Sequence, residues 1–420
     1  ISCSDISSIE EDRDGNICKL DEVYEVSNGL SKKREEFGFG YEFLAFTDVF
    51  NNYFVPQTLD NLVNSSEMER VKCSIKRGDV FLTRTSEKLD ELGRSCVALK
   101  DYPNATFNGF TKRLRPIGNV EILPEYAGYY FRSLKFRNAV TSMSSMTTRA
   151  SLNNDMISLL TITVPTLEEQ ENIANILSCL DEKIELNNEM NKTLEEMAQC
   201  IFKRWFVNFE FPSEDGKPYK SSGGEMVDSE LGMIPNGWEV VNYINTSDIQ
   251  YGFAFKSKLF NDKEGKPIIR IRDISNSYTP TYTTEEYNDL YIVTKNDILV
   301  GMDGEFKAHI WGGKDSLLNQ RVLRIRPKDN NSIAYSYFSI KEPLRYLENS
   351  KVGTTVIHLG KKDIDNIKIV YPPNNLISKY RDIADNLINK ICENKVEIME
   401  LLELRDSLLP KLMSGEIKVN

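Results

Sequence analysis

The segment from Thr166 to Phe206 constrains this chain most, because it runs for about forty residues without Gly or Pro. A continuous helix of that length spans ~60 Å at 1.5 Å per residue, far more than the mean helix of about 11 residues. Pro165 precedes it, and Thr166 and Glu169 have the spacing of a capping box. The sequence therefore predicts one long helix here.

The apolar residues of this helix recur every seven positions, as in a coiled coil. The same pattern returns near the C-terminus, and each member lies 207 residues after its counterpart (173 to 380, 187 to 394). Asn is central in both series, where a buried Asn fixes register rather than adding stability. We expect two helices packed antiparallel along these seams: Ile173, Leu180, Asn187, Leu194 and Ile201 in the first, and Tyr380, Leu387, Asn394, Leu401 and Leu408 in the second.

The regions before the two helices are also duplicated. Residues 78–82 correspond to 296–300, and 112–116 correspond to 323–327. Short apolar runs predict strands, and in the first half we expect a helix at 126–139 and strands at 41–46, 79–83, 95–99, 110–114 and 160–164. The chain is thus predicted to be α+β, with two globular strand-rich domains in pseudo-twofold tandem repeat.

The domain boundaries follow from this pattern and from one stretch rich in Gly, Ser and Pro. We expect a first strand-rich domain, a central long helix, a linker, a second strand-rich domain, and a distal long helix with its tail. Their ranges are 1–165, 166–208, 209–236, 237–373 and 374–420.

Composition excludes several classes of protein. No apolar run approaches the ~18 residues of a membrane span, and the seven cysteines are scattered without C-x-x-C spacing. With only His309 and His358 as histidines, a metal site is not expected. The N-terminal residues show no signal-peptide pattern, and the scattered thiols are typical of a reducing compartment, so we expect a cytoplasmic protein that contacts no membrane.

The net charge of −11 argues superficially against a nucleic-acid partner. Its distribution matters more, because affinity for phosphates follows local potential. The first long helix is acidic, whereas the flanking regions hold basic clusters at 32–34, 112–115 and 270–272. DNA binding outside the helix therefore remains open.

Motifs for chemistry are weak. A nucleotide phosphate loop and an adenine-methyltransferase motif are both absent. Asp297 followed by Glu305 and Lys307 resembles the carboxylates and lysine of a metal-dependent nuclease, although Asp297 also corresponds to Asp79 at a strand start. We keep two alternatives: a nuclease that uses these three residues, and a helical scaffold with no DNA role.

Binding chemistry remains. Gly29 and Gly252 occupy equivalent places, and each opens a turn followed by basic residues suited to phosphate contact. Arg84 can reach a guanine edge, and a salt bridge to Glu87 is an equally simple role for it. Residues 319–321 combine two amides that suit adenine with a guanidinium that suits guanine, and the alternative is that they cap a β-bulge. The candidate DNA-binding residues are Ser31, Lys32, Lys33, Arg34, Arg84, Arg149, Phe253, Lys256, Lys258, Arg272, Lys307, Asn319, Gln320, Arg321 and His358.

The chain resembles the specificity subunit of type I restriction-modification enzymes over nearly its whole length. The segments that carry the resemblance are VPTLEEQENIANILSCLDEKIELNNEMNKTLEEMAQCIFKRWF, SELGMIPNGWEV, YGFAFKS, NDILVGMDGEF, LNQRVLRIRP and ELRDSLLPKLMSGEIKV. The resemblance implies two target recognition domains, each reading half of a bipartite site in double-stranded DNA. It also implies a helix pair that sets the spacer.

The same resemblance implies partners and cofactors outside this chain. Two modification subunits would dock on the helix pair, bind S-adenosylmethionine and methylate adenine N6. Restriction subunits, which use ATP and Mg, would join them in defence against phage in the cytoplasm of a prokaryote. The chain itself would hold no cofactor and perform no catalysis.

Overall fold

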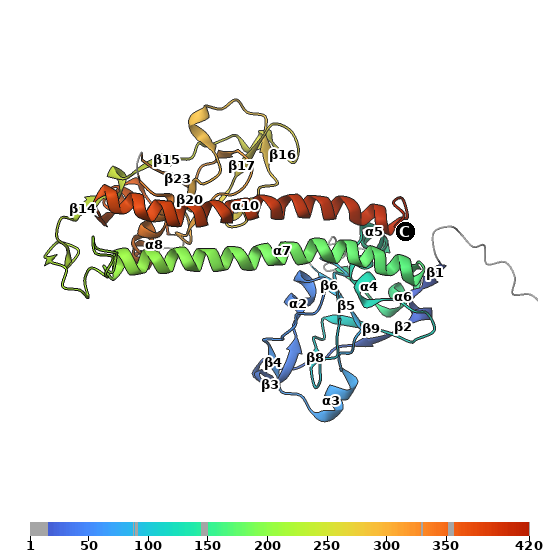
Figure 1. The fold of residues 1–420 in the computed structure, drawn as a ribbon. Coiled ribbons are helices and arrows are strands. Elements are labelled where there is room, and N and C mark those ends of the chain that lie inside the picture. The colour runs from blue at the N-terminus through green and yellow to red at the C-terminus, as the bar shows by residue number, and fades with distance from the viewer. Residues whose placement is uncertain are drawn as a thin grey trace, which may run out of the picture. The chain divides into compact units, whose positions relative to one another are not determined.

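The computed structural model describes residues 16–86, 88, 91–143, 150–328, 331–351 and 357–419. The chain divides into two compact units. The first unit comprises Ile1–Glu182 with Leu402–Asn420, and the second comprises Lys183–Leu401. Their helices and strands are labelled in Figure 1.

A four-stranded antiparallel sheet in the order β2-β9-β5-β7 forms the centre of the first unit. Its strands are Tyr24–Asn28 (β2), Thr111–Pro116 (β9), Val80–Thr83 (β5) and Ser95–Val97 (β7). Leu114 of β9 lies opposite both Val26 and Val80. All of β5 is buried, which suits a central strand of apolar and β-branched side chains.

A smaller sheet, β4-β3-β8, carries a second core in this unit. Its strands are Leu62–Val63 (β4), Phe37–Leu44 (β3) and Thr106–Phe107 (β8), and β3 and β8 run parallel. The alternation of side chains along β5 serves both cores: Val80 and Leu82 enter one, and Phe81 enters the other, where its ring lies 5.0 Å from that of Phe107.

The other elements of the first unit are short. The strands are β1 (Asn16–Lys19), β11 (Thr161–Val164), β6 (Thr85–Ser86) and β10 (Ala150–Ser151), paired β1 with β11 and β6 with β10. The helices are α1 (Leu20–Val23), α2 (Phe46–Asn51), α3 (Glu67–Lys72), α6 (Asn154–Leu159) and a 3-10 turn at Arg34–Glu36.

The predicted helix at 126–139 is in fact two helices, α4 (Pro124–Tyr130) and α5 (Leu134–Met143). Arg132 lies between them, and its guanidinium donates to the carbonyls of Ser95 (2.7 Å) and Asn52 (2.6 Å). Burial lowers the pKa of Arg132 to about 10. These long-range hydrogen bonds accompany the break, so the prediction was right about helix but wrong about its continuity.

The second unit repeats the central sheet as β15-β23-β20-β21, again antiparallel. The strands are Ser247–Tyr251 (β15), Val322–Pro327 (β23), Ile298–Gly301 (β20) and Ala308–Ile310 (β21). Ile325 lies opposite both Ile249 and Ile298, as Leu114 does with its neighbours in the first unit. β14 (Glu239–Asn242) pairs with β24 (Lys368–Tyr371), as β1 does with β11.

The second sheet of this unit is larger, with the order β16-β18-β17-β22-β19. The strands are Phe260–Asn261 (β16), Tyr282–Thr283 (β18), Lys266–Ile269 (β17), Ser316–Leu318 (β22) and Ile292–Val293 (β19). β17 and β22 run parallel, as β3 and β8 do. The helices are α8 (Ile333–Ser350) and α9 (Lys361–Asp365), with 3-10 turns at Tyr243–Asn245, Ser257–Leu259, Ile271–Asp273 and Asp289–Tyr291.

The same ion pair anchors both central sheets. Arg115 Nη2 lies 2.6 Å from Asp79 Oδ2, and Arg326 Nη2 lies 2.7 Å from Asp297 Oδ2. In each pair the arginine Nε also donates to the other carboxylate oxygen. The repeated strand order, register and ion pair confirm the predicted α+β tandem repeat.

Two long helices complete the fold: α7 (Leu167–Phe202, 36 residues) and α10 (Asn374–Met413, 40 residues). In the second unit, Asn187 Nδ2 donates to Glu397 Oε2 at 2.9 Å, and Tyr380 Oη donates to Ala198 O at 3.3 Å. The contact at residue 187 of α7 is made with residue 397 of α10, whereas the contact at residue 198 is made with residue 380. The two helices therefore run antiparallel (Figure 1).

The predicted seam residues are all buried or half-buried. The two central asparagines do not bond to each other, however, because Asn394 donates to Asn191 Oδ1 at 2.9 Å and Asn187 donates to Glu397. The buried seam residues are Ile173, Asn187, Tyr380 and Asn394, and the half-buried ones are Leu180, Leu194, Ile201, Leu387, Leu401 and Leu408.

In the first unit, the start of α7 and the end of α10 pack against the strand-rich domain. Arg405 Nη1 lies 2.7 Å from Asp181 Oδ1, and Tyr129 Oη of α4 donates to Asp181 Oδ2 at 2.8 Å. Leu409 and Leu412 join Ile173 in the main core of the unit. The C-terminal end of the chain thus packs against its first domain.

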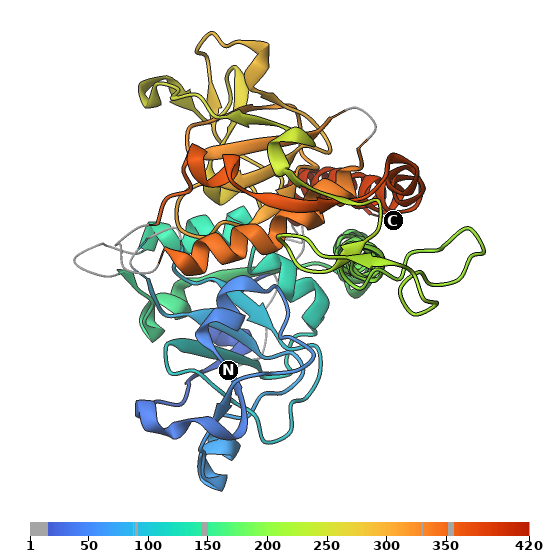
Figure 2. The same cartoon turned by 90° about the vertical axis from the view of Figure 1, so that its left-hand side faces the viewer.

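The segment between α7 and β14 is folded. It begins with a π-helical turn at Lys203–Val207 and includes the paired strands β12 (Met226–Val227) and β13 (Ile234–Pro235). The rings of Phe211 and Tyr219 stack 4.6 Å apart. Figure 2 looks along the helix pair and shows this segment in yellow-green at the end of α7.

The repeated ion pair gives a first prediction. Asp297→Ala should lower the free energy of unfolding by roughly 2–3 kcal/mol, because it leaves the Arg326 guanidinium without its carboxylate. The value lies below the range for fully buried pairs because the Arg326 side chain is 39% exposed. Urea unfolding followed by circular dichroism measures the loss.

Glu342→Ala is the matched control. Its pair with Arg345 has a similar separation of 2.7 Å, but both side chains are more than 70% exposed, so we expect little measurable change. Equal effects of the two substitutions would contradict a structural role for the Asp297 pair.

Candidate nucleic-acid interface

Two loops of the first unit, 29–31 and 108–110, cross at the ends of β2 and β8. Leu30 N donates to Phe107 O at 2.8 Å, and Gly109 N donates to Leu30 O at 2.9 Å. A Cβ on Gly29 would lie 2.1 Å from Asn108 O, so only glycine allows this approach. We call this arrangement the loop crossing.

The second unit contains the same crossing between loops 252–254 and 319–321. Phe253 N donates to Leu318 O at 3.0 Å, and Gln320 N donates to Phe253 O at 2.8 Å. A Cβ on Gly252 would lie 1.9 Å from Asn319 O. Glycine is therefore required at equivalent places in both units, as the aligned turns of the sequence suggested.

Ser31 and Arg84 come together at the first crossing. Ser31 Oγ would lie 2.6 Å from a Cβ on Gly109, and Arg84 Nη1 donates to Gly109 O over a long 3.4 Å. Arg84 N also donates to Phe110 O at 2.9 Å. Phe110 itself is 61% exposed. The sequence interpretation missed it because a phenylalanine beside a strand suggests core.

The basic run at 32–34 has fewer side chains free to bind a phosphate than its composition suggests. Lys32 Nζ lies 3.0 Å from Glu69 Oε1 and 3.1 Å from Glu36 Oε1, and the hydrogen bonds that its ammonium donates to Glu69 and Glu36 raise the pKa of Lys32. Lys33 and Arg34 are exposed. Of this run, they have the side chains best placed to meet a phosphate.

The equivalent run of the second unit combines aromatic and basic residues. Phe253 is exposed at its edge, while its ring packs 5.0 Å from Phe255 and 5.3 Å from Tyr291. Lys256 Nζ lies 3.6 Å from Glu285 Oε1. Lys258 is exposed in the 3-10 turn that follows.

The amides of the second crossing differ in accessibility. Asn319 is buried, and within the described residues its Oδ1 has no hydrogen-bond partner. Gln320 is exposed. The amide pair predicted to face adenine is therefore reduced to Gln320.

Arg321 and His358 meet through a residue that the sequence interpretation did not select, Asp303. Arg321 Nε lies 3.6 Å from Asp303 Oδ2, and His358 Nδ1 lies 2.7 Å from Asp303 Oδ1. Arg321 Nη1 lies 3.2 Å from the same imidazole nitrogen. Asp303 was missed because its counterpart in the first unit is Thr85, which carries no charge.

Arg272 and Lys307 line a hollow of about 390 Å³ beside Asp303. Lys307 Nζ lies 2.6 Å from Glu305 Oε2. His309 also lines the hollow, and burial lowers its pKa. The hollow thus presents side chains of both signs.

The nuclease alternative finds no support in this geometry. Both carboxylate oxygens of Asp297 are engaged by Arg326, and Glu305 pairs with Lys307. Among the described residues, no three His, Cys, Asp or Glu side chains form a cluster that could hold a metal ion.

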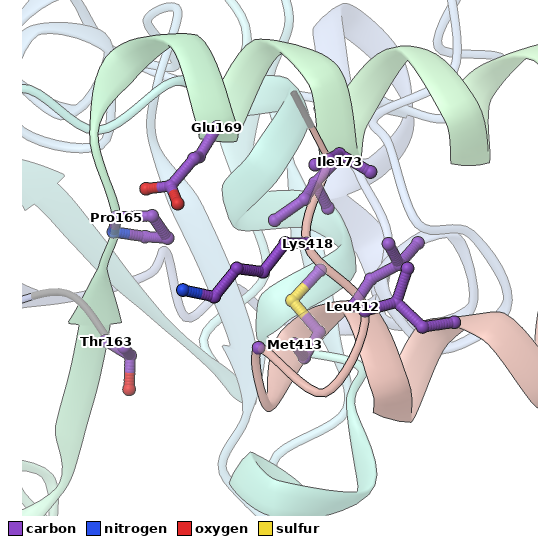
Figure 3. Close-up of a pocket in the computed structure, with 10 residues that line it drawn as sticks. Thr163, Pro165, Glu169, Ile173, Leu412, Met413 and Lys418 are labelled. Carbon is purple, nitrogen blue, oxygen red and sulfur yellow. The ribbon is translucent and has the colours of Figure 1, made fainter. Parts of the chain in front are cut away.

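Arg149 lies outside the described residues, so its side chain is not placed. A separate hollow of about 40 Å³ lies in the first unit between the start of α7 and the C-terminal tail, with Glu169 and Lys418 among its lining residues (Figure 3). It has room for water but not for a nucleotide. Over the described part of the chain, no helix is both long and apolar enough to cross a membrane.

Known proteins resemble this chain in sequence and fold. The model of the type I restriction modification DNA specificity domain family matches residues 13–196 and 235–403. The MjaIX specificity subunit of a type I restriction enzyme from Methanocaldococcus jannaschii is 26% identical over 434 residues, which cover 99% of this chain and 96% of the relative. The HindI specificity subunit from Haemophilus influenzae is 26% identical, covering 89% and 94%.

A solved structure shares the fold. The S subunit of a type I restriction-modification system from M. genitalium superposes with a TM-score of 0.56 at 16% identity, covering 96% of this chain and 98% of that one.

The loop crossing gives a second prediction. Gly252→Ala should speed hydrogen exchange of the Phe253 and Gln320 amides by about tenfold or more, because the added Cβ forces the two loops apart and opens their hydrogen bonds. Hydrogen exchange followed by mass spectrometry of peptides from the two loops reports the change.

Gly216→Ala serves as the control for backbone strain without a clash: its φ of +73° disfavours a side chain, but beyond its chain neighbours no heavy atom lies within 4 Å of the added Cβ. This substitution should leave both amides unchanged. Unaltered exchange in the Gly252 variant would mean that the crossing tolerates a side chain.

Proposed function

The chain belongs to the type I restriction-modification DNA specificity family, and we propose that each of its two strand-rich domains reads one half of a bipartite DNA site. Members of this family are non-catalytic and serve a multisubunit enzyme. Residues 1–165 and 237–373 would be the two target recognition domains. The helix pair would set the spacing between the half-sites.

One observation carries this proposal: the two units share a main-chain frame but differ in the side chains that the frame presents. Sheet order, register and loop crossing are repeated, whereas Phe110 and Arg321 occupy equivalent places. A protein that recognises two different sequences with one scaffold needs this combination. Contacts with base edges determine which sequence is bound, while the frame and its phosphate contacts position the protein on the DNA.

The helix pair supports the spacing role. Helices of 36 and 40 residues extend for ~54–60 Å at 1.5 Å per residue, comparable with one to two turns of DNA at ~34 Å each. The hydrogen bonds of Asn187 and Asn394 fix the register of the pair. A fixed register is what a ruler requires.

The partners follow the same reasoning. Exposed apolar side chains on the helices suit contact with modification subunits, notably Leu186 and Met197 on α7 and Ile383 and Leu404 on α10. Two such subunits would bind S-adenosylmethionine and methylate adenine N6 after flipping the base. Restriction subunits would add ATP- and Mg-dependent cleavage.

The test is to map N6-methyladenine in a host that expresses this chain with its cognate modification subunit. We expect methylation at a single bipartite motif, lost when this chain is deleted. Exchange of residues 1–165 for another recognition domain should change one half-site only. Methylation that persists without the chain, or no methylation with an active partner, would refute the proposal.

Phosphate contacts give a third prediction. Lys33→Ala and Lys258→Ala should each weaken binding of the methylase complex to all sequences about equally, and each should reduce the slope of log affinity against log salt by about 0.9. Titrations of labelled DNA at several salt concentrations measure this slope.

Lys32→Ala is the internal comparison. Its ammonium already faces Glu36 and Glu69, so the slope should change less than with Lys33→Ala. A larger effect at Lys32 would mean that these ion pairs open when DNA binds.

A further inference from the structure

We propose that four matched positions at each loop crossing select the bases of the half-site, and that Arg321 reads a guanine in the second half-site. The inference rests on the proposed function and identifies its base-reading residues. We call the four positions the readout set. Its members are Arg84, Thr85, Phe110 and Ser151 in the first unit, and Met302, Asp303, Arg321 and His358 in the second.

Main-chain hydrogen bonds establish two of the matches. Arg84 N donates to Phe110 O at 2.9 Å, and Met302 N donates to Arg321 O at 2.9 Å. The four residues therefore occupy the same two places in their units. Their side chains differ in size, charge and polarity.

The other two matches come from strand pairing. Ser151 lies opposite Thr85 in an antiparallel pair, and His358 lies opposite Asp303 in an antiparallel bridge. Because the frame is held by backbone groups, the side chains at these places can change without altering the fold. This is the property expected of positions that set sequence preference.

In the second unit the readout set presents one oriented guanidinium. His358 Nδ1 lies 2.7 Å from Asp303 Oδ1, and because a carboxylate oxygen only accepts, this hydrogen bond requires His358 Nδ1 to donate. Asp303 in turn faces Arg321 Nε. Asp303 and His358 are thus positioning residues that restrict the rotamers of Arg321.

The restrained guanidinium still has donors to offer. The Arg321 side chain is 54% exposed. Because the protonated Nδ1 of His358 cannot accept a hydrogen bond, both Nη1 hydrogens and both Nη2 hydrogens of Arg321 remain available. Arginine donating to O6 and N7 of guanine is the commonest specific contact in the major groove. Restricting the side chain beforehand lowers the entropy lost on binding.

The first unit offers different chemistry at the same places. Phe110 presents an exposed ring where the second unit has Arg321, and apolar side chains suit the methyl group of thymine. Thr85 and Ser151 supply two hydroxyls at the places that Asp303 and His358 occupy in the second unit. The cation of this set is Arg84, one position before Thr85, so the two half-sites should differ in sequence.

The test uses the complete chain in the methylase complex, with the motif taken from methylation mapping. Arg321→Ala should reduce discrimination at one G·C pair of the second half-site by about ten- to a hundredfold, with the first half-site unchanged. Asp303→Asn and His358→Gln should reduce discrimination at the same base pair by less. Binding to all single-base variants of the site supplies these values.

A modified base makes the test specific. Replacing that guanine with 7-deazaguanine removes the N7 acceptor, so it should weaken binding by the unaltered complex and have no further effect on the Arg321→Ala complex. The contacts of Arg321 are exposed to solvent, so Arg321→Ala should leave the midpoint of the unfolding transition unchanged.

The outcomes separate this inference from the proposed function. If Arg321→Ala weakens all sequences equally, Arg321 contacts phosphate and the inference is wrong while the proposed function stands. The same holds if 7-deazaguanine affects both complexes alike. If the unaltered complex shows no preference for any bipartite sequence, the proposed function fails.

Discussion

The close approach of two main chains at the loop crossing is the constraint on which the proposed recognition surface of each unit depends. Gly252 lies so near Asn319 O that no side chain fits between them, and Gly29 meets the same condition. Since the crossing is held by backbone hydrogen bonds, it places no demand on the neighbouring side chains. Selection can therefore alter the side chains that face a ligand while the loops stay in position.

In the helix pair, by contrast with the loop crossing, side chains rather than backbone groups fix the geometry. Asn187 is fully buried, and among the described residues its Oδ1 has no hydrogen-bond partner. A buried amide oxygen without a partner costs stability relative to an apolar seam. The hydrogen bond from Asn187 Nδ2 to Glu397 Oε2, however, can form in only one register of the two helices. The proposed spacing role of the helix pair would benefit from a unique register more than from maximal stability.

The sequence predicted what is periodic or duplicated. The long helices follow from heptads without Gly or Pro, and the paired sheets follow from segments that recur at matched places. It did not predict the break between α4 and α5, because the hydrogen bonds of Arg132 join it to residues some 40 to 80 positions away. It also missed Asp303, since reading by similarity between the halves overlooks the positions where they differ.

The charged side chains illustrate why composition alone could not locate the proposed DNA interface. Lys32 was selected as a DNA-binding residue because it stands in a basic run, but the fold brings Glu69 to it from a distant helix. Arg321, by contrast, keeps donors free even though Asp303 is beside it, because a guanidinium has five donors and an ammonium has three. A carboxylate offsets the charge of either side chain, but beside an arginine it leaves more N–H donors free and restricts their direction. An acidic chain can therefore still present a small number of oriented cations.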